Sequence, residues 1–318
     1  MSYRQQTVLH AGNRVTQSGF NLIELMLAST VTLFIIGALI TVVLGSAATG
    51  RSRDQASDLQ TNGRYALQQM KNDLLHAGFL GISSLFTPDQ PITANGIVVT
   101  GACDVANVGR LAQRLWGSND ANPFAATCIP AASYSTGDVL LIRSLNPTPV
   151  VAPFSANQVY YHSSYEGGQP FVGPVAPDFT GSNRQPPYLD YELQETVYYV
   201  SPFTNSAAEV PLMPALYRTR LGAGPAMAPE LVASGVENLQ VRYGVFQTNS
   251  TIQYFSANEI AAADWDLVKS LEIWILLRAD RPDTGYQNNT TYAMGGQNVA
   301  VNDGLRRLLL SSVTELRN

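Results

Sequence analysis

Residues 17–26, QSGFNLIELM, decide the fold because they place a glutamate at the start of a long apolar segment. Gly19 stands directly before Phe20, and Glu24 follows five positions after Gly19. A carboxylate inside a bilayer costs several kcal/mol unless it is paired, so an ordinary membrane span excludes it. An ordinary secretory signal carries its small residues after the apolar segment, not before it. The pattern therefore needs a role for both Gly19 and Glu24.

The apolar segment that follows is long enough to cross a membrane. Residues 25–50 contain no charged side chain, and as a helix these 26 residues extend about 39 Å, against about 30 Å of bilayer hydrocarbon. Residues 1–19 contain Arg4 and Arg14 and no acidic residue. This bias predicts that the N-terminus stays in the cytoplasm and that the bulk of the chain lies outside.

Three processing outcomes fit this segment: a retained anchor, cleavage after the apolar run near residues 46–48, or cleavage after Gly19. The third outcome accounts for both unusual residues, because it creates an α-amino group on Phe20, four residues from Glu24. The amine of one subunit then neutralises the Glu24 carboxylate of its neighbour. Glu24 is thereby predicted to be an assembly determinant.

The stretch GFNLIELM (19–26) resembles the type IV prepilin signal. The resemblance implies that a prepilin peptidase cuts between Gly19 and Phe20, that Phe20 becomes N-methylated, and that Glu24 acts in assembly. Many major pilins carry a proline in the middle of the apolar helix, and this run has none. The difference favours a minor pilin.

The helical pattern continues beyond the apolar segment. Gly78 and Gly81 predict its end, so one helix is expected from Phe20 to Ala77. Small and apolar residues recur every three or four positions along one face: Ala56, Leu59, Gly63, Ala66 or Leu67, Met70, Leu74 and Ala77.

Two further stretches resemble PilW-type minor pilins: NGRYALQQMKNDLLHAGFLG (62–81) and the final LRRLLLSSVTELRN (305–318). Residues 231–244 and 271–279 resemble the two strands that precede that end. The resemblance does not extend to residues 85–190. We interpret Arg64 and Tyr65 as structural residues, with contact to a partner as the alternative.

The remainder of the chain is predicted to form a β-rich head. The expected fold class is α+β, type IV pilin-like, with a long N-terminal helix packed on an antiparallel β-rich head. The expected division is a leader at 1–19, a transmembrane and assembly helix at 20–50, its amphipathic continuation at 51–81, and a periplasmic head at 82–318. Connections are expected at 145–156, 164–190, 222–230 and 281–300. Strands are predicted at 95–100, 137–144, 157–162, 195–201, 215–220, 237–246 and 270–279.

The two cysteines, Cys103 and Cys128, are 25 positions apart in a loop-rich region. In an exported protein they most simply form one disulfide. Closing such a loop contributes about 3 kcal/mol by chain-entropy arithmetic. Two free thiols are the alternative. A metal site is not predicted, because no histidine or third cysteine is close in sequence.

The sequence predicts no enzyme activity, no catalytic residue, no cofactor and no metal. It contains no nucleophile elbow, zinc-protease helix or P-loop. The carboxylates Asp264 and Asp266, and Asp280 and Asp283, are interpreted as solvated surface and not as calcium ligands. The net charge of −5 argues against nucleic acid as the main partner.

The resemblance implies a minor pilin that primes type IV pilus assembly, and so supports twitching motility, adhesion and DNA uptake. Its partners would be other minor pilins, the major pilin, the prepilin peptidase and the inner-membrane assembly platform. It would be a single-pass inner-membrane protein with its C-terminal domain in the periplasm, later incorporated into the pilus at the cell surface. Two alternatives remain open: a minor pseudopilin of a type II secretion system, and a signal-anchored periplasmic binding protein or enzyme.

Overall fold

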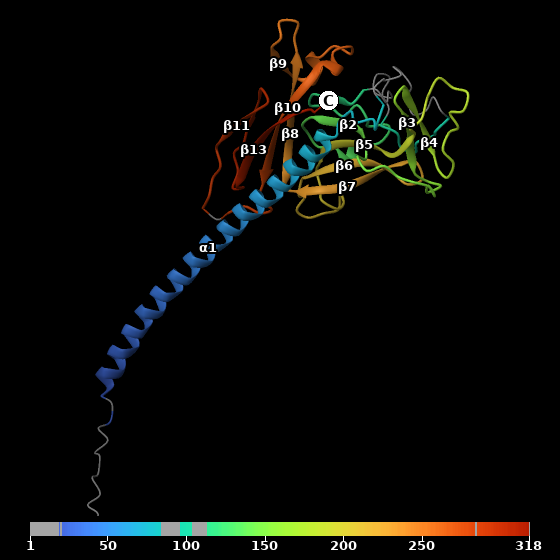
Figure 1. Cartoon of the computed structure of the whole chain (residues 1–318). Coiled ribbons are helices and arrows are strands. Elements are labelled where there is room, and N and C mark those ends of the chain that lie inside the picture. Colours follow the sequence, from blue (N-terminus) through green and yellow to red (C-terminus); the bar gives the residue numbers. More distant parts are fainter. Residues whose placement is uncertain (1–18, 20, 84–95, 104–112, 284, 318) are drawn as a thin grey trace, which may run out of the picture. The chain divides into compact units, whose positions relative to one another are not determined.

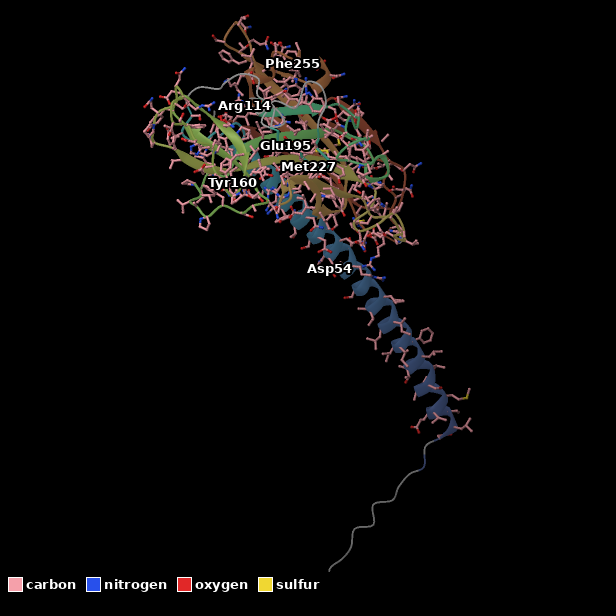
Figure 2. The ribbon with its side chains drawn as sticks, turned by 90° about the vertical axis from the view of Figure 1, so that its right-hand side faces the viewer. Asp54, Arg114, Tyr160, Glu195, Met227 and Phe255 are labelled. Atoms are coloured by element: carbon pink, nitrogen blue, oxygen red, sulfur yellow. A yellow bond between two sulfur atoms is a disulfide. The ribbon has the colours of Figure 1, made fainter. Side chains whose placement is uncertain are left out.

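The computed structural model describes residues 19, 21–83, 96–103, 113–283 and 285–317 (Figure 1). Phe20 and all of the predicted leader except Gly19 lie outside the described residues. The chain divides into two units, Met1–Arg53 and Asp54–Asn318. Asp54, labelled on the helix in Figure 2, is the first residue of the second unit.

One long helix, α1 (Leu22–Leu75), dominates the N-terminal part of the chain. Its bounds agree with the predicted helix to within two residues at each end. The predicted buried face of the Asp54–Leu75 part is correct at Leu59, Gly63, Ala66, Met70, Leu74 and, beyond the helix end, Ala77. The prediction is wrong at Ala56, which is exposed. The buried face continues from Leu59 to Gln55, four residues earlier, and not to Ala56, three residues earlier. Gln55 is buried and donates its side-chain amide to the carbonyl of Arg281 at 3.3 Å.

The chain leaves the helix through Gly78, whose φ of +78° favours glycine. The Gly78 N–H donates to the carbonyl of Arg143 at 2.9 Å, so the residues that follow the helix are hydrogen-bonded to the strand Val139–Leu145. This confirms the predicted helix stop and gives it a structural role.

The larger sheet has seven antiparallel strands, with β5 (Leu189–Ser201) at its centre. β2 pairs with one side of β5 at residues 193–198, and β6 pairs with the opposite side at residues 196–201. β3 pairs with the first part of β5, at residues 189–192. The other strands are β1 (Leu115–Ser118), β2 (Val139–Leu145), β3 (Val159–Ser164), β4 (Gly167–Val172), β6 (Ala215–Gly222) and β7 (Ala226–Ser234).

The smaller sheet has four antiparallel strands in the order β13-β10-β8-β9 (Figure 1). A separate hairpin, β11–β12, and three short 3-10 helices complete the described head. The bounds are β8 (Val236–Phe246), β9 (Ile252–Phe255), β10 (Val268–Arg278), β11 (Thr291–Met294), β12 (Gln297–Ala300), β13 (Arg307–Glu315), η2 (Ala131–Ser133), η3 (Ala257–Glu259) and η4 (Trp265–Leu267).

The predicted alternation in β8 and β10 is confirmed, since Leu239, Val241, Leu271 and Ile273 and their period-two neighbours face the core. The strand predicted at 95–100 is wrong: among its described residues only Thr100 makes a bridge, to Ala226. Strands also occur inside three predicted connections, namely β4, β7 and the β11–β12 hairpin. Prolines in β4 and β7 gave these segments the appearance of loops, although an edge strand tolerates proline.

The Asp54–Leu75 part of α1 shares one core with the smaller sheet. Leu59, Ala66, Met70 and Leu74 belong to the same buried cluster as the inward residues of β8 and β10. Gly63 allows the closest approach, because a Cβ at this position would lie 2.5 Å from Leu310 Cδ1. The helix and the head strands are therefore one packed body within this unit.

A buried carboxylate joins the two sheets. The N–H of Asp138, at the start of β2, donates to the carbonyl of Leu239 in β8 at 2.7 Å. In return the Asp138 carboxylate accepts the N–H of Val241 at 2.7 Å and that of Asp120 at 3.0 Å. Burial raises the pKa of Asp138 from 3.8 to about 7. Asp138 therefore satisfies backbone groups on this edge of β8, where no described strand pairs with it.

Candidate assembly segment and head surfaces

Glu24 lies in the first turn of α1, where an acidic side chain is favoured by the positive end of the helix dipole. Its Oε2 accepts the backbone N–H of Asn21 at 3.3 Å. Asn21 directly precedes the helix and Glu24 is its third residue, so this contact is the carboxylate half of a capping box. Glu24 therefore has a structural role within its own chain besides the predicted role between chains. Its predicted partner, the amine of Phe20, lies outside the described residues.

The apolar part of α1 is exposed at every residue from Leu22 to Ser46. An 18-residue window of the helix has a mean hydropathy of 2.5 and none of it is buried. Phe34 is 81% exposed and Leu33 is 72% exposed. Within the described chain, α1 alone is long and apolar enough to cross a membrane. Such a surface is stable only against lipid or against other apolar helices.

Five hydroxyl groups of this segment are satisfied inside the helix. Each donates to a carbonyl three or four residues earlier at 2.7–2.9 Å: Ser29 to Met26, Thr30 to Leu27, Thr32 to Ala28, Thr41 to Ala38 and Thr49 to Gly45. In hydrocarbon every polar group needs an internal partner. The segment is therefore suited to an apolar environment despite its serines and threonines.

Arg64 and Tyr65 are not part of the core, and their interpretation as structural residues stays a prediction. Both are exposed on α1, and Tyr65 is 52% exposed. The helical period explains this, because the buried positions Gly63 and Ala66 on either side place Arg64 and Tyr65 on the outer face.

Cys103 and Cys128 are joined by a disulfide in the structure. Both belong to a buried cluster with Phe124, Ile129 and residues of β2 and β5. The bond therefore ties the segment before β1 to the connection between β1 and β2.

The described residues contain no group of three or more His, Cys, Asp or Glu side chains placed to hold a metal ion. His162 Nδ1 and Asp190 Oδ1 are 2.7 Å apart across neighbouring strands, and the histidine ring packs against Phe179 with centroids 4.5 Å apart. Both side chains are largely buried, so the pair links β3 to β5 beneath an aromatic layer.

Buried ion pairs serve the same structural purpose. Glu195, which is labelled in the seven-stranded sheet in Figure 2, pairs with Arg143 at 2.6 Å. Asp73 on α1 accepts the Tyr198 hydroxyl at 2.6 Å and lies 3.7 Å from Arg218. The interpretation of Asp283 as solvated surface is wrong, because its side chain is 19% exposed and pairs with Arg306 at 2.8 Å. These charges hold elements together.

The long apolar helix and the antiparallel β-rich head define a protein of the type IV pilin-like class. Residues 197–318, from the second half of β5 to the C-terminus, match the family model described as type IV pilus-assembly protein W. In this C-terminal part of the head the chain is similar to PilW-type pilins.

A solved structure of a type IV-like pilin from Thermus thermophilus is similar at 16% sequence identity and a TM-score of 0.37. The comparison covers 81% of this chain and 96% of that chain. No curated protein matches the sequence significantly.

Proposed function

We propose that this chain is a minor pilin that takes part in initiating assembly of a type IV pilus. It acts by packing its apolar helix against the helices of other minor pilins and of the major pilin. The observation that carries the proposal is the exposed helix surface from Leu22 to Ser46, whose only charged side chain, Glu24, lies in the first turn. The proposal assigns no catalytic residue, and the family match to a pilus-assembly protein supports it.

Processing at Gly19 completes the assembly segment in this proposal. The prepilin peptidase cuts before Phe20, and the N-methylated amine of Phe20 stays close to the membrane surface. Among its described contacts Glu24 accepts only a backbone N–H, and it has no positively charged partner there. In this proposal the Phe20 amine of a neighbouring subunit supplies that positive charge. A paired carboxylate avoids the several-kcal/mol cost of an unpaired one in hydrocarbon.

The proposed location is the inner membrane, with residues 82–318 in the periplasm and later in the pilus. The disulfide between Cys103 and Cys128 supports an oxidising compartment for this part of the chain. The internally satisfied hydroxyls of α1 support residence in hydrocarbon before extraction by the assembly platform.

The N-terminal residue and the intact mass of the protein from its own host test this function. The expected result is a chain that begins at N-methylated Phe20. A chain that begins at Met1 or at Thr49 contradicts the proposal. Deletion of the gene is expected to reduce piliation and to leave type II secretion unchanged, and the reverse outcome would assign the chain to a secretion pseudopilus.

A further inference from the structure

The outer edge of β13 has no neighbouring strand among the described residues. β13 pairs with β10 on one side only, and it is the last strand of the smaller sheet (Figure 1). At its ends, Leu316 donates to the carbonyl of Lys269 and Ala279 donates to the carbonyl of Arg306, both at 2.8 Å. The even-numbered residues of the strand therefore direct their backbone groups towards β10, and the odd-numbered residues direct theirs away.

The outward backbone groups of Leu309, Ser311 and Val313 have no hydrogen-bond partner among the described residues. This stretch is also accessible, since Ser311 is exposed and Val313 is 58% exposed. A row of unpaired N–H and C=O groups is a template for another strand.

The other described sheet edges are protected, and β13 is not. β7 carries Pro229 and the charged Glu230, and β4 carries Pro170. β1, β9, β11 and β12 have only four residues each. Proteins normally block an edge with prolines, charges or short strands. β13 has nine residues, and from Leu308 to Thr314 it contains no proline, no charge and no bulge.

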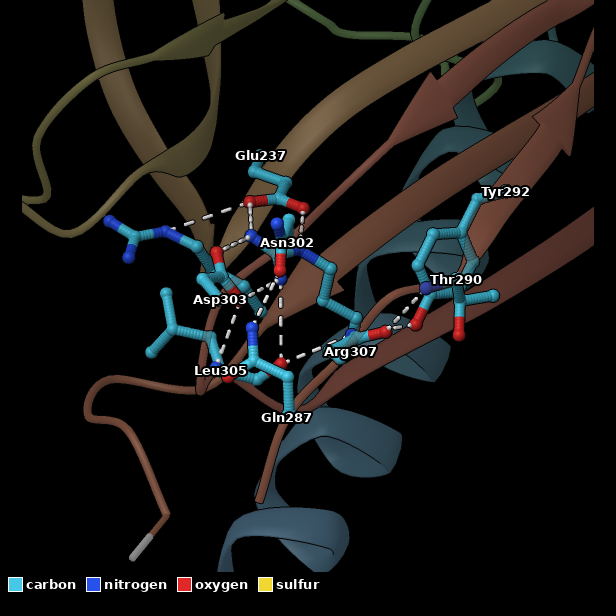
Figure 3. Close-up of polar contacts among 10 residues, drawn as sticks. Glu237, Gln287, Thr290, Tyr292, Asn302, Asp303, Leu305 and Arg307 are labelled. Atoms are coloured by element: carbon cyan, nitrogen blue, oxygen red, sulfur yellow. Dashed lines mark hydrogen bonds and ion pairs between the residues drawn. The ribbon is translucent and has the colours of Figure 1, made fainter. Parts of the chain in front are cut away.

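The start of β13 is held rigidly, which prepares the edge for pairing. Arg307 pairs with Glu237 of β8 through its Nε, at 2.5 Å, and with Asp303 at 2.7 Å (Figure 3). The Arg307 side chain is only 6% exposed, so its charge is neutralised by these two carboxylates inside the head. A strand that is already ordered loses little further entropy when a partner adds to it.

We propose that the edge of β13 at Leu309–Val313 binds an extended segment of another pilin subunit by β-strand addition. The partial charges of the outward N–H and C=O groups alternate along the edge, and only another extended backbone carries the complementary alternation. The partner segment is free of proline and carries small or apolar side chains beside Leu309 and Val313. This inference rests on the proposed function, because it takes the partner from the same pilus.

Antiparallel pairing of two β13 edges places a two-fold axis perpendicular to the sheet, and this axis reverses the direction of the Asp54–Leu75 part of α1 in the second copy. The proposal therefore takes a different pilin subunit as the occupant, and a second copy of this chain is an outcome of the test.

The variant Ser311→Pro tests the proposal, with Ser311→Thr as its matched control. Proline removes the outward N–H of residue 311 and leaves the ladder to β10 intact, as expected for an edge position. Threonine keeps the N–H and favours strands. Both variants are made in the full-length protein in its own host, and equal melting temperatures in detergent show that each is folded. Val313→Lys provides a second disruption of the edge, by charge.

A photo-reactive amino acid at Glu315 supplies the readout in cells that assemble pili. The expected result is a cross-link to an extended segment of a different pilin, which is retained in Ser311→Thr and lost in Ser311→Pro and Val313→Lys. A cross-link to a second copy of this chain, or equal cross-linking in the proline and threonine variants, overturns the proposal. Glu24→Ala is compared in parallel. If Glu24→Ala reduces piliation while Ser311→Pro shows normal cross-linking and normal piliation, the proposed strand addition at β13 is rejected and the proposed pilin function is retained.

Discussion

The carboxylate of Asp138 and the backbone N–H of Val241 are 2.7 Å apart, and this contact links the seven-stranded sheet to the four-stranded sheet. A second bond, from the Asp138 N–H to the carbonyl of Leu239, makes the connection reciprocal. Together they satisfy backbone groups of β8 that no strand covers. The joint is buried, so its protonation state is coupled to the stability of the head.

The stability of the folded chain is expected to fall as the pH rises from about 4 to about 7. The folded pKa of Asp138 is about 7 and the unfolded value is 3.8, so the folded state retains a proton that the unfolded state releases in this window. The contribution of Asp138 is fully present below pH 3.8 and is lost above 7. At about 1.4 kcal/mol per pKa unit, the full change is on the order of 4 kcal/mol.

Urea unfolding of the full-length protein in detergent, followed by tryptophan fluorescence, measures this dependence. Asp138→Asn removes the titrating group and is expected to flatten the pH profile, whereas Asp58→Asn on the exposed face of α1 is expected to retain it. Equal slopes in Asp138→Asn and the unchanged protein would show that Asp138 is not the group responsible.

Glu24→Ala is expected to leave membrane insertion and cleavage intact and to reduce piliation strongly, because the neighbouring amine loses its counter-charge. Glu24→Gln separates the two roles of this residue. Glutamine still accepts the Asn21 N–H but carries no charge. Pilus counts by electron microscopy are expected to be low in both variants. Normal piliation in Glu24→Gln would indicate that helix capping, and not pairing between subunits, is the function of Glu24.

Gly63→Leu is expected to destabilise the head by about 1–3 kcal/mol, the usual cost of overpacking a filled core. A side chain at position 63 would collide with Leu310 and Leu277, whose Cδ1 atoms lie 2.5 and 2.9 Å from the added Cβ. Gly50→Leu is the matched control, since nothing lies within 4 Å of an added Cβ there. Thermal unfolding of both variants checks the difference, and equal melting temperatures would argue against close packing at Gly63.

The disulfide between Cys103 and Cys128 is expected in protein isolated from its own host. Non-reducing peptide mapping should recover the two cysteines in one linked peptide pair, and free thiols would contradict this. Replacing both with serine is expected to lower the free energy of unfolding by about 3 kcal/mol, because the unfolded chain regains the freedom of a 25-residue loop.

Local patterns explain which parts of this fold could be predicted. The helix and the alternation in β8 and β10 follow from spacing within one segment, so the prediction was accurate to within two residues at both ends of α1. The edge strand β7 escaped prediction because Pro229 makes its sequence resemble a connection. The hairpin β11–β12 escaped because its four-residue strands bury little apolar surface on their own.

The sequence by itself determined the apolar helix, the Gly19–Glu24 motif and most of the long strands, because each depends on residues that are neighbours in the chain. Only the tertiary structure decided that Asp138 joins two sheets, that Gln55 and not Ala56 faces the head, and that β13 has an open edge. Those features depend on contacts between residues more than a hundred positions apart, or on the absence of a neighbouring strand among the described residues. Spacing along the chain carries no information about such contacts, since packing selects them when the core closes.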